Sequence, residues 1–486
     1  MRFSLIDGLI VLAYVVAVTW AGMLVRGRVR RVSDFLVAGR RIRYNLGVAT
    51  LVATELGLVT MMYFAEQGFR FGFAAFIIGI IWAAAYITIG KTGFVIDRLR
   101  ALEIMTITEY FQVRYTRGVR ILGAILLIIA GVLSLGVFLK LGAVFIVHFL
   151  DIPVTSIHVA TTVLLLLVLA YTALGGMISV VLTDFIQFVF LSVGMVLTTL
   201  LVVFRDGFGD FFAQATQTYG AAGFDPLNHP EYGWWFIAYW SVFAISGCVL
   251  WQPVAQRILS SKDPGVNRFI FTSTGMMFLG RAFFPIVWGI GAALYFGLGT
   301  DAAAGMPKLL AAILPVGLLG LLTAGMFAAM MSTDSSYILA SSSIIVRDVA
   351  GPLRRNAMSD SEHLRWMRGS IVAIGILMLV FGIWYEIKDT AFRYLLDVTT
   401  IYYAGGLPAL VGGLYWKRAT TGGAYAAFVC GAALPMAFVI EDIILQTSGG
   451  TGMIAQLMDP NVRGFVSFVL GFGGLYLGSL FSKTIS

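Results

Sequence analysis

Residues Ala328–Ser336 read Ala-Ala-Met-Met-Ser-Thr-Asp-Ser-Ser, and they place four hydroxyls and a carboxylate inside a segment that is otherwise typical of a membrane-spanning helix. Polar groups at bilayer depth are costly, so such a cluster is by default a candidate functional site. On a helix, Ala329, Ser332, Thr333 and Ser336 share one stripe, with Ser335 beside it. Hydroxyls on one face suit a hard monovalent cation. The alternative is that these small residues only let helices approach closely and bond back to their own helix.

The composition excludes a soluble fold. Of the 486 residues, 59% are hydrophobic and 12% are charged, which predicts an all-α integral membrane protein. Only two cysteines, Cys248 and Cys430, are present, so no disulfide framework is implied. The net charge of +8 lies mostly in short loops, which favours a role in membrane topology over an anionic partner, and we expect no nucleic acid.

Apolar runs recur through the whole chain, and we predict about 13 transmembrane helices. Their approximate ranges are 5–25, 44–68, 71–90, 118–148, 154–174, 177–204, 233–256, 269–298, 312–346, 366–386, 391–415, 421–444 and 463–482. If the N-terminus lies outside, 24 of the 33 Lys and Arg residues fall on the inner side and seven on the outer side. This asymmetry predicts a multi-pass protein of the cell membrane, the inner membrane in a bacterium, with its N-terminus outside and its C-terminus in the cytoplasm.

Two charged residues lie far from the ends of their predicted spans. Glu55 is near mid-span and two residues before Gly57, which suggests an interrupted helix with carbonyls exposed to an ion or a solute. Lys140 is too deep in the fourth span to snorkel, so it needs an anionic partner: Glu55, Asp184 or the carboxylate of a bound solute. The structural alternative is a Glu55–Lys140 pair that only holds helices together, or a protonated Glu55.

Two further polar sites fall in the sixth and seventh spans. Asp184 lies about two turns into the sixth span, which opens with Gly175-Gly176, and it either supplies the negative charge for a cation or pairs with Arg281 or a lysine. In the seventh span, Trp251-Gln252-Pro253 predicts a helix break that leaves carbonyls unpaired near polar side chains. Trp251 has a structural alternative, since aromatic residues in spans more often belong to the core.

The chain carries no catalytic motif. It has no metalloprotease, nucleophile-elbow or phosphate-loop sequence, and none of its four histidines has a partner at a useful spacing. The sequence therefore predicts a protein that is not an enzyme.

Three stretches together resemble the sodium:solute symporter family, especially its proline-type and sialic-acid-type members. They are Gly175-Gly176 with Thr183-Asp184 and Gln187, then Gln252-Pro253 with Gln256-Arg257, then Ala329–Ser336 with Arg347-Asp348. The resemblance implies a single polytopic transporter domain with a LeuT-type core of two inverted five-helix repeats. On this chain the repeats fall at 44–204 and 233–415, with one extra helix at 5–25 and two at 421–482.

The same resemblance implies sodium as the coupling ion. It places one sodium site on backbone carbonyls and hydroxyls of two core helices, here Ala53, Leu56, Ala329, Ser332 and Thr333. Some members bind a second sodium, for which the corresponding residues are Asp184, Ser332, Ser335 and Ser336. Asp334 departs from the apolar residue that is typical of relatives, so the number of bound cations stays open.

The solute is expected to carry a carboxylate. In sugar-transporting relatives, Glu, Gln and Ser side chains bind the hydroxyls of the sugar. The corresponding positions here look like Val59, Thr60, Gly79 and Trp82, which do not repeat that pattern, so a sugar is disfavoured. Glu55 resembles an acidic residue of proline-type members, and Lys140 falls where sialic-acid-type members hold a carboxylate. The resemblance thus implies a sodium-coupled symporter that imports an amino acid, sialic acid or other organic acid by alternating access, with a pocket formed by Glu55, Gly57, Thr60, Lys140, Trp251 and Gln252.

Three alternatives remain at this point. Glu55 keeps proton coupling open, because a carboxyl at this depth is able to titrate near neutrality. A neutral solute such as a sugar fits the same fold, and a membrane sensor would bind its solute without flux. The expected partners are a small solute, sodium ions and the lipid bilayer; the oligomeric state is left open, and a monomer is compatible with the sequence.

Overall fold

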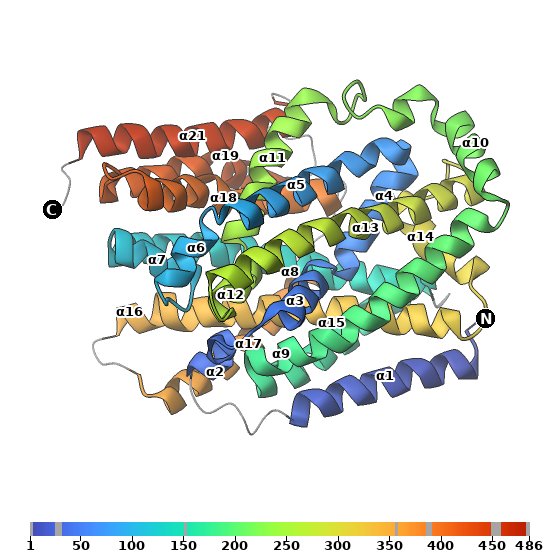
Figure 1. Ribbon diagram of the computed structural model, residues 1–486, viewed down its shortest axis with the longest axis horizontal. Helices are drawn as coiled ribbons and strands as arrows, with labels where there is room; N and C mark the ends of the chain where they lie inside the picture. Colours follow the sequence, from blue (N-terminus) through green and yellow to red (C-terminus); the bar gives the residue numbers. More distant parts are fainter. Residues whose placement is uncertain are drawn as a thin grey trace.

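The protein is built from long helices packed side by side. The computed structural model describes residues 3–24, 32–149, 153–354, 358–384, 391–448 and 458–482. Within these ranges the regular structure is helical, apart from a single isolated bridge between Ile42 and Ser261. The long helices run roughly along the longest axis of the molecule (Figure 1), and the predicted all-α class is confirmed.

The helices of the first half of the chain include the first interrupted one. They are α1 (Leu5–Leu24), α2 (Val32–Val37), α3 (Tyr44–Glu55), α4 (Leu58–Phe71), α5 (Ile77–Thr92), α6 (Ile96–Ala101), α7 (Ile107–Arg114), α8 (Arg117–Phe149) and α9 (Ile157–Phe204). The predicted second span is therefore two helices, α3 and α4, separated at residues 56 and 57.

The second half contains the other interrupted helix. Its elements are α10 (Phe208–Tyr219), α11 (Gly233–Leu250), α12 (Gln252–Ser260), α13 (Pro264–Phe296), α14 (Ala302–Ile313), α15 (Leu318–Ile344), α16 (Gly351–Leu353), α17 (Asp360–Trp384), α18 (Ala391–Tyr415), α19 (Thr421–Ser448) and α21 (Pro460–Phe481). A π-helical turn, Ile345–Ala350, continues α15.

Nine segments of the described ranges are long and apolar enough to cross a bilayer. They are Leu58–Thr92, Arg117–Phe149, Met177–Phe204, Gly233–Leu250, Pro264–Phe296, Leu318–Leu353, Asp360–Gly382, Thr421–Leu445 and Pro460–Phe481. Two shorter apolar helices, Leu5–Val18 and Ala302–Ile313, accompany them. A multi-pass membrane protein is confirmed, whereas the number of 13 spans stays a prediction.

The centre of the molecule is formed by α3, α9, α13 and α15. Helix α15 packs on α9 and α3, while α13 packs on α3, α4 and α5. Nearly every residue of α15 is buried, including the whole polar run Ser332–Ser336. The cluster of hydroxyls that marked the sequence therefore lies inside the protein and not against lipid.

Helix α1 is fastened to the start of α15. The Asp7 carboxylate is buried, and its Oδ1 accepts hydrogen bonds from the backbone N–H groups of Gly317 (2.8 Å) and Gly320 (2.7 Å). A carboxylate at a helix N-terminus satisfies donors that have no partner within the helix, and it is favoured by the helix dipole. Helix α1 also packs along α9 and α15.

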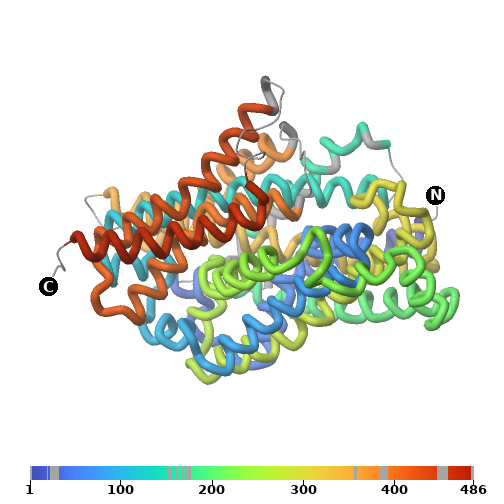
Figure 2. Tube along the Cα trace, turned by 90° about the horizontal axis from the view of Figure 1, so that it is seen from above, coloured from blue at the N-terminus to red at the C-terminus, as the bar shows by residue number. Residues whose placement is uncertain are grey.

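The C-terminal helices form a separate group. Helices α18, α19 and α21 pack against one another, and they lie at the opposite edge of the bundle from α1 (Figure 1). Seen from above, α19 and α21 occupy one side of the molecule near the C-terminus (Figure 2).

One boundary of the predicted spans was wrong. The boundary at Gly175-Gly176 falls inside α9, which is helical from Ile157 to Phe204, because glycine is compatible with helical backbone angles and no proline removes a hydrogen bond there. The loop at 205–232 contains a helix, α10, whose apolar residues Phe211 and Ala215 are buried.

Candidate functional site

The first helix break lies at Leu56 and Gly57. Leu56 leaves the helical region (φ −90°, ψ 60°), and Gly57 is extended (φ −75°, ψ 156°). The Leu56 N–H still bonds to the Val52 carbonyl, but within the described ranges no backbone N–H bonds to the carbonyls of Ala53 and Leu56 across the break. Both carbonyls are therefore available to a ligand, as predicted for an interrupted membrane helix.

Helix α15 touches this break directly. The Thr333 hydroxyl donates to the Thr54 carbonyl (3.0 Å), and a Cβ on Gly57 would lie only 2.7 Å from Thr333 Oγ1. The close approach thus requires glycine at position 57. It brings Thr333, a predicted hydroxyl ligand, against the end of α3, and Ser332 precedes it on α15.

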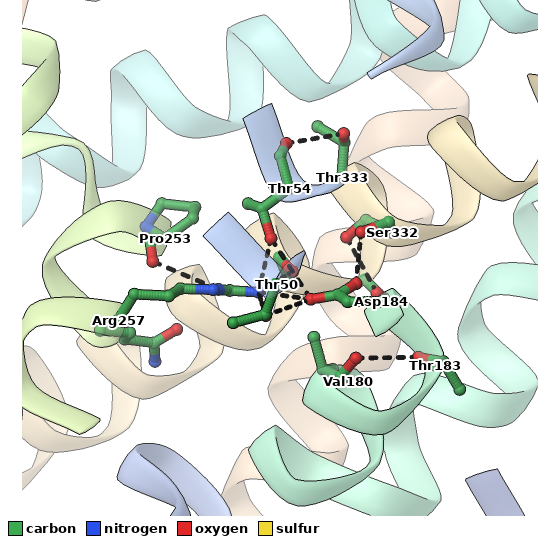
Figure 3. A network of polar contacts seen from close by, with 12 residues as sticks. Thr50, Thr54, Val180, Thr183, Asp184, Pro253, Arg257, Ser332 and Thr333 are labelled. Atoms are coloured by element: carbon green, nitrogen blue, oxygen red, sulfur yellow. Dashed lines mark hydrogen bonds and ion pairs between the residues drawn. The ribbon is translucent and has the colours of Figure 1, made fainter. Parts of the chain in front are cut away.

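The Asp184 carboxylate lies next to this contact and is fully buried. Its Oδ1 accepts a hydrogen bond from Ser332 Oγ, and its Oδ2 accepts from Thr50 and, at 3.4 Å, from Thr54. Figure 3 shows Asp184 from α9 facing Thr50 and Thr54 of α3 and Ser332 of α15. One carboxylate therefore joins three helices of the centre.

The cation that pairs with Asp184 is Arg257 of α12. Its Nη2 lies 3.1 Å from Asp184 Oδ2 and donates to Ser336 Oγ (2.9 Å). The same nitrogen donates to Thr54 Oγ1 (2.6 Å), while Nη1 donates to the carbonyl of Pro253 (3.2 Å). The predicted partners of Asp184, Arg281 or a lysine, were wrong, because the second helix break lets α12 place Arg257 over α3.

That second break lies at Trp251, directly before Gln252-Pro253. Trp251 is extended (φ −62°, ψ 118°) between α11 and α12, which confirms the break predicted from Pro253. Its ring lies 5.7 Å from that of Tyr337. The Gln252 side chain accepts a hydrogen bond from the Ile107 N–H (3.2 Å), so its oxygen holds α7 against the break.

Glu55 lies at the end of α3 in a second charged cluster. Its Oε2 pairs with Arg281 Nη1 (2.9 Å), and its Oε1 accepts from the Tyr86 hydroxyl (2.5 Å). Arg281 Nη2 also donates to Thr60 Oγ1 (3.3 Å), whereas its buried Nε has no hydrogen-bond partner within the described ranges. The structure thus brings Glu55 and Thr60 together as predicted and adds a guanidinium with a free donor.

The other predicted site residues are placed as follows. Lys140 is on α8, partly exposed, and the ion pairs of Glu55 and Asp184 are made by arginines instead. Ser335 donates to the Ser332 carbonyl of its own helix (3.1 Å), so its hydroxyl points along α15. Asp334 is buried away from the Asp184 network, and its Oδ2 has no hydrogen-bond partner in the described part of the chain.

Four residues of the site were not predicted as site residues from the sequence: Arg257, Arg281, Thr50 and Tyr86, although Arg281 was considered as a partner of Asp184. Arg257 was noticed only as part of a motif, although four residues from Pro253 is the spacing at which its guanidinium reaches that carbonyl on a helix. Arg281 was visible as a charge inside a span, which by itself marks a functional site. Thr50 lies one turn before Thr54, on the same face of α3.

The residues around Leu56 fit a sodium ion. The Ser332 proton is directed to Asp184 and the Thr333 proton to the Thr54 carbonyl. Each hydroxyl oxygen therefore keeps lone pairs for a cation, as do the carbonyl oxygens of Ala53 and Leu56 at the break. An all-oxygen set of dipoles is what a hard cation prefers, and the Asp184 bond orients Ser332 as an outer partner orients a metal ligand.

Comparison with known proteins agrees with this geometry. A family model described as the sodium:solute symporter family matches residues 35–431. The sodium/sialic acid symporter SiaT of Proteus mirabilis is 25% identical over 448 residues, which cover 87% of each chain. The sodium/glucose cotransporter of Vibrio parahaemolyticus is also 25% identical, over 97% of this chain and 90% of its own.

A solved structure has the same fold. The substrate-bound, outward-open form of a Na+-coupled sialic acid symporter superimposes with a TM-score of 0.81 over 100% of both chains, at 21% sequence identity. The transporter MhsT, solved with L-phenylalanine, superimposes with a TM-score of 0.54. The interrupted helices and the hydroxyl face of α15 are thus found in a fold that known transporters share.

Proposed function

Because the chain belongs to the sodium:solute symporter family, we propose that it uses the inward sodium gradient to import a small, carboxylate-bearing solute by alternating access. The observation that carries this proposal is the Leu56–Gly57 break: Thr333 of α15 contacts it, and Glu55, which is paired with Arg281, directly precedes it. We place the sodium ion at Ala53, Leu56, Ala329, Ser332 and Thr333.

Coupling follows from the position of the two sites on one break. Sodium joins α3 to α15 through carbonyls and hydroxyls, and the solute contacts Glu55, the last residue of α3. Each ligand therefore stabilises the same closed arrangement of the break. Such coupling is reciprocal: sodium raises the affinity for the solute by the factor by which the solute raises the affinity for sodium.

The charged cluster supports a zwitterionic or anionic solute. The buried Nε–H of Arg281 has no hydrogen-bond partner among the residues that the structure describes, and a carboxylate is the group that a guanidinium recognises best. An ammonium group on the same solute would pair with Glu55, so an amino acid leaves no charge unpaired. We assign Gly57, Thr60, Lys140, Trp251 and Gln252 to the surrounding pocket.

The first test is thermal unfolding of the purified protein with sialic acid, L-proline, lactate and D-glucose, in sodium and in potassium at equal ionic strength. We expect one carboxylate to stabilise the protein in sodium only, since a ligand of the folded state at 100 times its Kd contributes about 2.7 kcal/mol. Ser332→Ala should abolish the effect. Ser343→Ala is the matched control, because in the described part of the chain that buried hydroxyl bonds only to the Ala340 carbonyl of its own helix.

Each alternative has its own signature in this test. Equal stabilisation in potassium would overturn sodium coupling and favour protons carried by Glu55. Stabilisation by D-glucose alone would favour a neutral solute. Binding without sodium-driven uptake in proteoliposomes would identify a sensor and refute the transport proposal.

The orientation is testable separately. We propose that the N-terminus lies outside and the C-terminus in the cytoplasm, in the inner membrane if the cell is bacterial, and that a monomer transports. Single cysteines introduced beside Asp225 and beside Lys417 should be labelled from opposite sides of the membrane. Labelling of both from the same side would contradict this topology.

A further inference from the structure

A groove runs along the surface of the bundle between α5 and α11. Both helices belong to segments that are long enough to cross a bilayer, and Figure 1 shows α11 beside α5. The cavity volume of the groove is about 560 Å³, within the range of roughly 300–1,000 Å³ that is typical of small-molecule sites. Its walls come from both helices and include Ile80, Ala84, Thr88 and Thr92 of α5 and Ser241 and Ile245 of α11.

The groove lies on the face of α5 that is turned away from the polar centre. Ile80, Ala84 and Thr88 follow one another at intervals of four, so they form one stripe of the helix, and all three are exposed. Tyr86, on the opposite face, is buried and donates its hydroxyl to Glu55. In a membrane the groove therefore opens toward the acyl chains of the lipids and is separate from the solute site.

The lining of the groove offers little to a polar ligand. The Thr92 hydroxyl donates to the Thr88 carbonyl (2.7 Å), and the Ser241 hydroxyl donates to the Ile237 carbonyl (2.7 Å). Both hydroxyl protons are thus used within their own helices. A polar molecule would lose its hydrogen bonds to water here without replacing them, which costs free energy, so the groove favours an apolar occupant.

The length of the groove matches one leaflet of a bilayer. From Ile80 to Thr92 the helix rises about 18 Å, at about 1.5 Å per residue. The hydrocarbon core is about 30 Å thick, so one leaflet contributes about 15 Å. An extended acyl chain therefore fits along the groove, with the rest of the lipid beyond one of its ends.

A guanidinium lies at the Thr92 end. Phe94 lines this end of the groove, and its ring stacks on that of Tyr415 at 5.3 Å between centroids. The guanidinium carbon of Arg98 lies 4.0 Å from the centroid of the same Tyr415 ring, and Arg98 Nη1 donates to the Leu414 carbonyl. Tyr415 thus fixes both the apolar end of the groove and the cation that follows it.

The charge at this end is positive. Lys91 precedes Thr92 on α5 and is exposed, as is Arg98. The neighbouring carboxylate, Asp97, is paired with Arg268, whose Nε lies 2.9 Å from Asp97 Oδ2. Among the residues that the structure describes, neither Lys91 nor Arg98 forms an ion pair. An anionic headgroup at the end of the groove would supply the missing charge.

We propose that the groove between α5 and α11 binds one acyl chain of an anionic glycerophospholipid, whose phosphate is held by Lys91 and Arg98. This site goes beyond the proposed function and depends on neither sodium nor the solute. In the proposed topology the Thr92 end lies at the cytoplasmic surface, where anionic lipids attract basic residues. If the two cations only orient the protein in the membrane, no lipid is selected and the groove is not needed.

The test is the binding of phosphatidylglycerol and of phosphatidylcholine with identical acyl chains to the delipidated full-length protein in detergent, measured by native mass spectrometry. A basic residue near the membrane surface contributes about fivefold to the affinity for an anionic lipid. We therefore expect phosphatidylglycerol to bind about 25-fold more tightly, and Lys91→Gln to lose about fivefold of its affinity. Arg98→Lys, which keeps the charge, should lose less. Arg365→Gln, at an exposed arginine of α17, is the matched control.

A second pair of variants tests the groove itself. Ala84→Trp places a large ring in the groove from an exposed position of α5 and should abolish the preference for phosphatidylglycerol. Ala433→Trp, at an exposed alanine of α19, is its control and should bind like the wild-type protein.

Three results would overturn the proposal. Equal affinity for the two lipids would show that the cations select no headgroup. Binding of phosphatidylglycerol by Ala84→Trp as tight as by Ala433→Trp would place the lipid outside the groove. Displacement of phosphatidylglycerol by glycerol 3-phosphate, which carries the phosphate without an acyl chain, at the same concentration as by the lipid itself would show a phosphate site that does not use the groove.

Discussion

We expect Gly57→Ala to weaken sodium binding far more than it weakens the fold. A Cβ at position 57 would lie 2.7 Å from Thr333 Oγ1 and 3.2 Å from Thr333 Cβ, whereas ordinary contact begins at 3.4 Å. The break and α15 must therefore separate by about 0.7 Å to admit the methyl group. The backbone angles of Gly57 (φ −75°, ψ 156°) are open to alanine, so the conflict is purely steric.

The size of the effect follows from this conflict. Overpacking of a well-packed interior costs about 1–3 kcal/mol. The cost falls mainly on the sodium-bound state, because the proposed sodium site joins the carbonyls of Ala53 and Leu56 to the hydroxyls of α15. A loss of 1–3 kcal/mol in that state corresponds to about 5- to 150-fold weaker sodium binding.

The assay is a sodium titration monitored by thermal unfolding, with potassium replacing sodium at constant ionic strength. Gly209→Ala is the matched control, since a Cβ there, on α10, meets no atom within 4 Å. Sodium affinity of Gly57→Ala equal to that of Gly209→Ala would refute the view that α15 and the break form the site. A large loss of stability without sodium would instead show that the contact is needed for folding.

Three further predictions concern other contacts. Glu55→Gln or Arg281→Gln alone should lower the free energy of unfolding by about 3–5 kcal/mol, because each leaves the other charge buried without its partner. The double variant should lose less than the sum of the two single losses, and additive losses in a double-mutant cycle would contradict this prediction. Asp7→Ala should lower the free energy of unfolding by about 1–3 kcal/mol, measured by thermal unfolding, because the N–H groups of Gly317 and Gly320 lose their acceptor. Asp7→Asn keeps an acceptor oxygen and should lose less. Equal losses in the two variants would count against the contact. Burial lowers the pKa of His229, so the folded loop favours the neutral imidazole. Protonation below the ordinary pKa of 6.5 should therefore destabilise the loop, and its resistance to proteolysis near Glu231 should fall as the pH drops below that value. If His229→Gln loses protease resistance over the same pH range, His229 is not the cause.

The sequence predicted both helix breaks because each leaves a local signal. Glu55 and Gly57 stand where an apolar helix would carry neither, and Pro253 removes a backbone donor. The hydroxyl face of Ser332, Thr333 and Ser336 follows from helical spacing alone. The residue ligands of the sodium site came from the resemblance and stay a proposal, with the free carbonyls of the break as their support.

The partners of the buried charges were beyond the sequence. Asp184 is 73 residues from Arg257, and Glu55 is 226 residues from Arg281. From the sequence alone, several cationic residues are possible partners for each carboxylate. Only the packing of α12 and α13 determines which of them forms the ion pair. The same limit applies to α10 and α14, which are too short and too mixed in composition to stand out from loops.

The buried pair of Asp184 and Arg257 also has a consequence for biosynthesis. A ribosome adds about 5–20 residues per second, so the 73 residues between the two positions take roughly 4–15 seconds to make. During that interval α9 must enter the membrane with a carboxyl whose partner does not yet exist, at a cost of about 2.5–3.5 kcal/mol for an aspartate at the helix centre. The first half of the nascent chain therefore cannot complete its packing until α12 emerges, which makes the two halves assemble as one unit.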